Sequence, residues 1–349
     1  LYKYPQSAFP YQQLVQENQV RDRLQEPFNL LDAGVMDEGR HWDIEVFYAK
    51  SSAEEVHIHI YAHNRGPEAE KIYLLPTLWF RNTWSWGDET EKPLIKNLPI
   101  SGDYAWAVSA EHAQLGKYFL YGAQTAELLF TENETNTERL WEVENNGPYV
   151  KDAFHRYLIE GAHDAVNPQG EGSKFSAVTS LTVEGGQRIR LDLVLTTEQK
   201  KKPFAESERV FSLRRSEADI FYDNILPEAS PEDMRILRQS LAGMIWTKQF
   251  FHFDVKRWLQ GDQHPLPDGR QYGRNRHWQH LQARDIISMP DKWEYPWFAA
   301  WDLAYHCVAL ALVDVDFAKD QIELMLSERY LHPNGQIPAY EWAVGDVNP

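Results

Sequence analysis

The chain has 349 residues, a formal net charge of −17 and 43% hydrophobic residues. This hydrophobic content suffices for a packed core and excludes a disordered chain, and the length fits roughly two domains. The acidic balance argues against nucleic acid and anionic membranes as partners, because both are bound through basic surfaces. No apolar run approaches the roughly eighteen residues of a membrane span.

The residue types that stand out are cysteine and tryptophan. The single cysteine, Cys307, excludes an intrachain disulfide and is expected to pack in an apolar helix as a small hydrophobe. This usage permits a reducing compartment, and we expect a cytoplasmic location. Thirteen tryptophans raise the aromatic content to 13%. Aromatic rings fill cores, and they also stack on the apolar faces of sugars, so local patterns must decide between the two.

Short alternating segments dominate the first half of the chain. Residues 43–49 and 56–61 alternate apolar and polar side chains, which predicts strands with His57 and His59 facing solvent. Further strands are expected at 72–80, 104–109, 118–122, 128–131, 177–183 and 188–197. The Glu-Gly-Gly-Gln sequence between the last two predicts a hairpin turn. Many short strands with few helix patterns predict an antiparallel β-sandwich over residues 1–204.

The pattern becomes helical after Gln199. Residues 205–225 predict a linking helix, and residues 226–349 a helical domain. Ser230 is placed to cap a helix over residues 232–248. A second helix is expected to begin at Pro296, a residue suited to the first helical position. Its continuation, CVALALV, is apolar on most faces and is therefore expected to be buried.

This buried helix needs more neighbours than the rest of the helical half provides. The sandwich also lacks an obvious start, and the last residues form a structureless loop. We therefore expect the chain to be an internal part of a larger protein. The remainder of its own polypeptide would then be its main macromolecular partner.

The segment 288–306, SMPDKWEYPWFAAWDLAYH, places three tryptophans around the carboxyl groups of Glu294 and Asp302. Among aromatic side chains a carboxylate loses hydration, so Asp302 is expected to hold its proton near neutral pH, as a general acid must. The alternative is a carboxylate satisfied by a basic group or an indole N–H in a helical core.

His306 follows Asp302 by one helical turn on the same face. Two ligands at this spacing could begin a metal site, but no third ligand is evident, so we expect no metal and no other cofactor. His306 is instead expected to support Asp302 or to lie in the core.

Two further groups combine aromatic and polar side chains. Trp246, Lys248 and Gln249 lie near the end of the first long helix and could form a sugar-binding wall. Core packing is the simpler reading of Trp246 alone. A second group lies in the loop after the last helix, which could return to the rim beside Asp302. Its members are Gln336, Tyr340, Glu341 and Trp342. A solvated loop carboxylate is the alternative for Glu341.

Four segments together resemble glycoside hydrolase family 63, in particular its bacterial branch near the mannosylglycerate hydrolases. They are AGMIWTKQFFHFDVKRWL, SMPDKWEYPWFAAWDLAYH, LWFRNTWSWG and HPNGQIPAYEWAVGDVNP. The resemblance runs over residues 1–349 and implies an α+β multidomain chain. Its β-sandwich would precede the first helices of an (α/α)6 barrel, and the chemistry would invert the anomeric centre without a metal.

The resemblance also implies residue roles. The family's general acid matches Asp302 in Trp301-Asp302, and a sugar-contacting tryptophan matches Trp297. The family's sugar-contacting loop matches residues 340–342, and its general base is expected beyond Pro349. Inverting hydrolysis needs two carboxyl groups roughly 6.5–9.5 Å apart on opposite sides of the sugar. We therefore expect an inverting glycosidase that acts on an α-glucoside or a related short oligosaccharide.

Two alternatives remain open. An inverting glycoside phosphorylase on the same architecture would need a single acid and a basic phosphate pocket, drawn from Arg274, Arg276 or Lys292. A non-catalytic glycan-binding protein would explain the aromatic excess without a second carboxylate.

Overall fold

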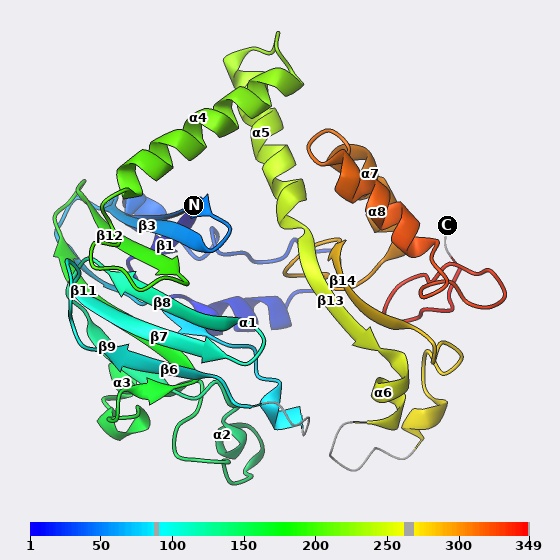
Figure 1. Ribbon diagram of the computed structural model, residues 1–349, viewed down its shortest axis with the longest axis horizontal. Coiled ribbons are helices and arrows are strands. Elements are labelled where there is room, and N and C mark those ends of the chain that lie inside the picture. The colour runs from blue at the N-terminus through cyan, green and yellow to red at the C-terminus, as the bar shows by residue number, and fades with distance from the viewer. Residues whose placement is uncertain (87–90, 262–268, 348–349) are drawn as a thin grey trace. The chain divides into compact units, whose positions relative to one another are not determined.

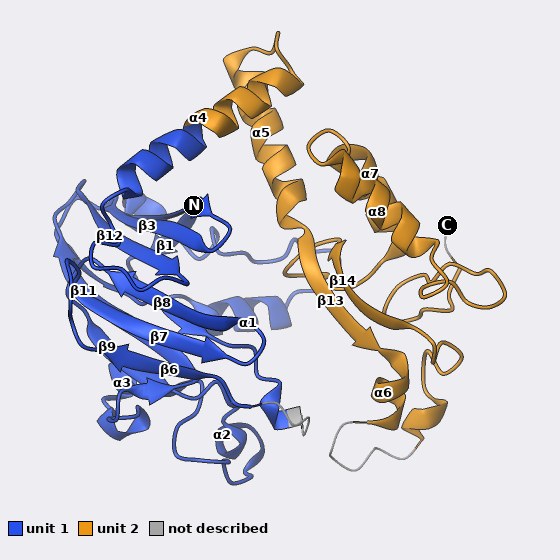
Figure 2. Cartoon of the chain, viewed as in Figure 1, with its two compact units in different colours: residues 1–215 blue, residues 216–349 orange. Residues whose placement is uncertain are grey.

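The computed structural model describes residues 1–86, 91–261 and 269–347 (Figure 1). The chain is α+β and divides into two compact units, Leu1–Arg215 and Ser216–Pro349, with the boundary inside a single helix, α4 (Figure 2). The strands of unit 1 are β1 (Tyr2–Pro5), β2 (His41–Ser52), β3 (Glu55–Asn64), β4 (Glu70–Leu74), β5 (Thr77–Trp79), β6 (Leu94–Leu98), β7 (Trp106–His112), β8 (Gly116–Gly122), β9 (Glu127–Thr131), β10 (Glu171–Gly172), β11 (Lys174–Val183) and β12 (Arg188–Thr196).

Both units also contain helices. Unit 1 contains α1 (Tyr11–Gln19), α2 (Thr137–Trp141), α3 (Ala153–Glu160) and the first half of α4 (Ser207–Ile225). Unit 2 continues with α5 (Pro231–Trp246), β13 (Lys248–Asp254), α6 (Val255–Gln260), β14 (Gln282–Ser288), α7 (Ala300–Leu310) and α8 (Val315–Met325). Its described residues therefore combine a few helices with a two-stranded sheet, and they do not complete an (α/α)6 barrel.

Two antiparallel sheets form unit 1. The larger has the order β1-β2-β3-β12-β8-β7-β6-β10, and in the smaller β11 pairs with β4, β5 and β9. Trp106 and Val108 of the larger sheet pack against Phe130 and Phe175 of the smaller in one buried cluster. Burying alternate side chains between the sheets explains the period of two in the sequence.

Two strand predictions for unit 1 were wrong in detail. The expected strand 72–80 is divided into β4 and β5, because Pro76 has no N–H to continue the ladder. The expected hairpin between β11 and β12 is absent, since these strands belong to different sheets and pair with other neighbours. The turn at Gly185 crosses from one sheet to the other. A Cβ there would lie 2.1 Å from the carbonyl oxygen of Pro67, so only glycine allows this approach.

The prediction that His57 and His59 face solvent was also wrong. Both side chains are buried, because the first half of α4 covers this face of β3. His57 Nδ1 lies 2.7 Å from Ser207 Oγ, and the ring of His59 stacks on Phe211 with centroids 3.8 Å apart. Alternation assigns side chains to a face of a sheet, but it does not reveal which face a later helix covers.

Unit 2 begins as predicted and then departs from the prediction. Ser230 caps α5 by accepting a hydrogen bond from Asp233 N at 3.1 Å. The helix ends at Trp246, however, and the next residues form strand β13, which pairs with β14. In β13, Phe251 and Phe253 are buried whereas Phe250 is exposed. This period of two outweighs the helical signal that precedes it.

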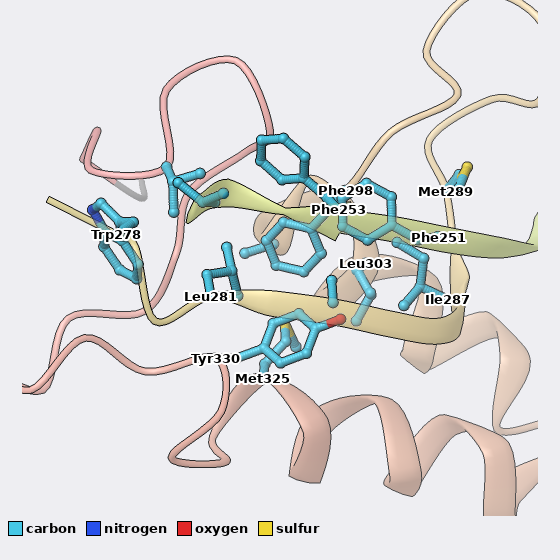
Figure 3. Packing of buried hydrophobic residues seen from close by; sticks show 14 of the residues in the cluster. Phe251, Phe253, Trp278, Leu281, Ile287, Met289, Phe298, Leu303, Met325 and Tyr330 are labelled. Atoms are coloured by element: carbon cyan, nitrogen blue, oxygen red, sulfur yellow. The ribbon is translucent and has the colours of Figure 1, made fainter. Parts of the chain in front are cut away.

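The core of unit 2 lies between the two-stranded sheet and the helices. Phe251 and Ile287 from the sheet surround Leu303 of α7, together with Phe298 and Tyr330 (Figure 3). This cluster positions the beginning of α7, which carries several of the predicted site residues.

Helix α7 begins at Ala300 and not at Pro296, and it is not buried on most faces. Leu303, Cys307 and Leu310 are buried, but Tyr305 and Val308 are 71% and 74% exposed. The delayed start follows from the extended backbone at Ala299, which pairs with Tyr340. Within the described part of the chain, no helix has the length and apolar character needed to cross a membrane.

Candidate functional site

The candidate site is built on two backbone segments of unit 2 that lie side by side. Ala299, just before α7, forms an isolated β-bridge with Tyr340. Ala300 N donates to Ala339 O at 2.8 Å, and Glu341 N donates to Phe298 O at 3.0 Å. The loop after α8 therefore returns to the first turn of α7, and residues 340–342 lie beside the segment that leads to Asp302.

Asn275 holds this loop in place. Its Nδ2 donates to Glu341 O at 2.7 Å, and its Oδ1 accepts from Val344 N at 2.8 Å. The residue is buried and has a φ of 66°, a left-handed conformation that asparagine tolerates better than most residues. Sequence reasoning overlooked it. The available signal was an asparagine within a glycine- and arginine-rich loop.

Aromatic rings and guanidinium groups gather beside the loop. The Trp297 ring meets those of Trp342 and Tyr295 edge-to-face, with centroids 5.7 Å and 5.2 Å away. The Arg274 guanidinium lies 4.1 Å from the ring centroid of Trp342 and 5.0 Å from that of Trp258. Indole faces that contact a planar cation on one side can present apolar surface to a sugar on the other.

Arg270 adds a second guanidinium, 4.6 Å from the ring centroid of Trp258. The Nε atoms of Arg270 and Arg274 are buried and lack hydrogen-bond partners among the residues the structure describes. Trp258 and Arg270 were not predicted as site residues. The signal that could have found them is the pair of arginines, Arg270 and Arg274, that follows Trp258 in the same loop region.

Glu341 directly precedes Trp342 of this cluster, and it is half-buried. Burial raises the pKa of the Glu341 carboxyl group, and the charge of Arg274 opposes that rise. Glu341 can therefore remain protonated at a higher pH than an exposed glutamate. This property suits a proton donor or a hydrogen-bonding ligand.

Asp302 lies in the first turn of α7 and is half-buried. The helix start favours a negative charge at this position. One turn later, His306 Nδ1 lies 2.7 Å from Ser288 Oγ. Burial lowers the pKa of His306, and the charge of Asp302 acts in the opposite direction. The two side chains therefore interact electrostatically.

The predicted group at the end of α5 is divided between different structural roles. Lys248 Nζ donates to Asp314 Oδ2 at 2.5 Å and lies 4.1 Å from the ring centroid of Phe317. Because Asp314 also caps α8, this lysine joins two elements of the unit. Gln249 Nε2 donates to Trp246 O at 3.0 Å. The Trp246 ring is exposed, and Lys292 Nζ lies 4.9 Å from its centroid.

The remaining predicted residues lie at the edges of the site. Glu294 is exposed, and its carboxylate raises the pKa of Tyr295. Gln336 Nε2 donates to Gly345 O at 3.1 Å and to Asp346 O at 3.2 Å, which closes the returning loop. Trp301 is about half exposed and contacts Tyr305 edge-to-face.

Among the described residues, no group of three or more histidine, cysteine, aspartate or glutamate side chains could hold a metal ion.

Among known proteins, one has a sequence similar to that of this chain. The uncharacterized protein YMR196W of Saccharomyces cerevisiae is 37% identical over 398 residues, which cover 100% of this chain and 36% of that protein. The chain thus spans about a third of the length of the curated relative it matches. The chain matches no family model.

Solved structures give only faint similarity. A galactose mutarotase related enzyme from Lactobacillus acidophilus aligns with 48% of this chain and 66% of its own, at 8% identity and a TM-score of 0.25. A protein described as a kojibiose phosphorylase, from the human microbiome, aligns with 62% of this chain and 23% of its own, at 10% identity and a TM-score of 0.26. Similarities of this size do not establish a shared fold. The chain is therefore similar along its whole length to part of one longer yeast protein.

Proposed function

We propose that the chain belongs to a carbohydrate-processing enzyme, an inverting glycoside hydrolase that acts on an α-glucoside or a related short oligosaccharide. The observation that carries the proposal is the paired backbone of residues 298–300 and 339–341. It brings the Trp297–Trp342 aromatic pair, Glu341 and the first turn of α7 with Asp302 into one neighbourhood. Aromatic rings beside carboxyl groups suit both the binding of a sugar ring and proton transfer to its leaving oxygen.

In this proposal Asp302 is the general acid. Its carboxyl group donates a proton to the glycosidic oxygen while a second carboxylate activates water on the opposite side of the ring. The second carboxylate would come from polypeptide beyond residue 349. This fits a relative of which the chain covers only 36%. Trp297 and Trp342 would contact the sugar, with Tyr340 and Glu341 as polar ligands.

The test uses the full-length protein and a panel of α-glucosides, with the anomer of the released sugar followed by proton NMR. An inverting enzyme releases the β-anomer first. Asp302→Asn should lower kcat by roughly 10²–10⁴-fold, because it removes the proton donor. Asp316→Asn is the matched control, since Asp316 also lies in the first turn of a helix and no site role is assigned to it.

Glu341→Gln separates the two carboxyl groups. If Asp302 is the acid, this change should mainly raise KM. If Asp302→Asn turned over substrate at a near-normal rate and Glu341→Gln did not, Glu341 would be the general acid. Sugar binding without turnover in the wild-type protein would favour a glycan-binding protein instead.

A second candidate, an inverting glycoside phosphorylase, is supported by one observation. Among the described residues, the buried Nε atoms of Arg270 and Arg274 have no hydrogen-bond partner; Arg270 lies over Trp258, and Arg274 lies over Trp258 and Trp342, so both could bind an anion. Of the other two basic residues considered, Arg276 donates to Tyr272 O, and Lys292 lies over the Trp246 ring. Turnover that depends on inorganic phosphate and fails in Arg274→Gln would favour phosphorolysis. Turnover without phosphate would exclude it.

The proposal extends to the surroundings of the chain. We propose that polypeptide beyond these 349 residues packs on the exposed apolar face of α7, where Trp301, Tyr305 and Val308 lie about one turn apart. A cytoplasmic location fits the buried free thiol of Cys307, which pairs with no other cysteine.

A further inference from the structure

A second set of exposed aromatic side chains lies around the loop between β14 and α7, residues 290–297. On this loop, Trp293 is 83% exposed and Tyr295 is 45% exposed. Trp246, at the end of α5, is 60% exposed. Single exposed apolar residues are common on protein surfaces, but a group of large rings in one place marks a site of interaction. The two tryptophans are not among the residues that the proposed reaction uses.

Backbone and side-chain contacts bring Trp246 and this loop together. Met289 N donates to Thr247 O at 2.9 Å, so the residue before the loop is bonded to the residue after Trp246. Lys292 Nζ lies 4.9 Å from the ring centroid of Trp246 and 6.0 Å from that of Trp293. One ammonium group is therefore close to both indoles, at distances typical of cation–π contacts. The two rings and the lysine belong to one surface.

The turn that carries Trp293 is fixed by its own hydrogen bonds. Asp291 Oδ1 accepts from Trp293 N at 2.6 Å and from Glu294 N at 2.7 Å. These two N–H groups hold the pKa of the Asp291 carboxyl group below its usual value, so its charge is retained. Pro296 fixes one more backbone angle shortly after the turn. A ring presented by an ordered turn loses less conformational freedom when it binds a ligand.

This surface is continuous with the candidate site. The Tyr295 ring contacts that of Trp297, and the Trp297 ring contacts that of Trp342. Trp293 follows two residues before Tyr295 on the same loop, and Lys292 connects Trp293 to Trp246. A ligand bound beside Trp297 and Trp342 can therefore extend along the loop towards the exposed indoles.

The chemistry of the surface suits a sugar chain better than polypeptide or nucleic acid. Charged groups stand among the rings, contributed by Asp291, Lys292 and Glu294. Apolar polypeptide on this surface would remove water from these charges without replacing its hydrogen bonds. Sugar hydroxyl groups can donate to the carboxylates and accept from the ammonium group, while the apolar faces of the sugars stack on the indoles. Nucleic acid is disfavoured by the net charge of −17.

We propose that Trp246, Lys292 and Trp293 form an outer sugar-binding surface, and that the substrate is an oligosaccharide that extends past the sugars on either side of the cleaved bond. The two indoles contact the outer sugar residues, and the ammonium group of Lys292 donates to their hydroxyl groups. The inference rests on the proposed function for the position of the cleaved bond, and it narrows the substrate class from any α-glucoside to longer chains.

The first experiment measures binding without turnover. Calorimetry uses the full-length protein with Asp302→Asn, methyl α-glucoside and α-linked gluco-oligosaccharides of two to six residues. We expect affinity to rise with chain length. Trp293→Ala and Trp246→Ala should each weaken binding of the longest chain by roughly three- to tenfold and leave methyl α-glucoside within about twofold. Trp141→Ala is the matched control, because this ring of α2 is 63% exposed in the other unit.

Two results of this experiment would overturn the proposal. One is an affinity that does not grow with chain length, and the other is an equal loss in Trp141→Ala. Fluorescence quenching by acrylamide then tests whether the surface is open in the full-length protein. The emission that is lost in Trp293→Phe should be readily quenched in the wild type. Emission shielded from acrylamide would show that further polypeptide covers Trp293, which also contradicts the proposal.

Kinetics separate this surface from the reaction itself. Trp293→Ala should raise KM for the longest oligosaccharide by roughly three- to tenfold, with kcat nearly unchanged and no effect on an aryl α-glucoside. Lys292→Met keeps the apolar stem and removes the ammonium group, and it should raise the same KM by a smaller factor. Binding that grows with chain length but without hydrolysis would refute the proposed reaction and support the surface. Hydrolysis with a KM independent of chain length would refute the surface alone.

Discussion

Unit 1 and unit 2 differ in how completely they bury their apolar side chains. In unit 1, two sheets enclose residues such as Phe175 and Leu193, and α4 covers part of the outer face through Val210. In unit 2, α7 buries Leu303 on one side and leaves Tyr305 exposed on the other. Two sheets can bury each other's apolar faces, whereas packing in a single layer buries only one side of each helix.

The largest expected effect tests the closed core of unit 1. Phe175→Ala should lower the free energy of unfolding by about 3–5 kcal/mol, because the removed ring fills space between Trp106 and Phe130. Urea denaturation followed by tryptophan fluorescence measures the loss. Phe250→Ala, at a half-exposed ring in unit 2, is the control and should cost less than about 1 kcal/mol. Equal losses would contradict the contrast between the units.

An intermediate effect tests the cover that α4 provides. Burial lowers the pKa of His57, although Glu55 opposes this, so the folded state binds this proton less readily than the unfolded state. Stability should therefore rise with pH through the window below the ordinary value of 6.5 and fall as the pH drops through it. We expect a loss on the order of 1 kcal/mol in that window, measured by urea denaturation at several pH values.

His57→Gln should reduce this dependence but not abolish it, because burial also lowers the pKa of His59 and of His306; His155→Gln, at an exposed position of α3, should leave it unchanged. Lys200, which pairs with Glu55, keeps that carboxylate ionised; the lowered pKa of Glu55 places its own contribution at more acidic pH, below 4.5. A slope just below 6.5 that is as steep in His57→Gln as in the wild type would exclude a contribution from His57.

The smallest effect tests the open face of α7. Tyr305→Lys should change the stability of the 349-residue chain by less than about 0.5 kcal/mol, because the ring is mostly exposed. In the longer protein the same change should be clearly destabilising if further polypeptide covers this face. Leu303→Ala on the buried face should cost about 2–5 kcal/mol in either form. If Tyr305→Lys changed the stability of both forms equally, this face of α7 would be exposed in the longer protein as well.

The sequence predicted the positions of individual strands and helices better than it predicted which strands pair. Alternation located most strands of unit 1, and Ser230 located the start of α5, because both signals depend on neighbouring residues. The division of strand 72–80 could also have been predicted, since Pro76 lacks a donor. The partners of β12 could not, because a turn containing two glycines fits either a hairpin or a crossing between sheets.

The candidate site was predicted to a similar extent. Its returning loop was anticipated from its aromatic and acidic residues, and it does pair with the segment before α7. Lys248 was expected on a helix, but it lies in a strand and joins Asp314. The contacts of Asn275 and the hydrogen bond between Ser288 and His306 were not anticipated, because the partners of each are distant in sequence.

The position of β12 has a consequence for synthesis. It is the last strand of unit 1 in the sequence, yet it lies between β3 and β8, pairing with both. Until residues 188–196 leave the ribosome, the β1–β3 group and the β6–β8 group have no strand to join them. Each would expose an open edge during that interval, and such edges promote aggregation. The nascent chain is therefore expected to need protection by chaperones until β12 inserts, after which α4 can cover the completed sheet.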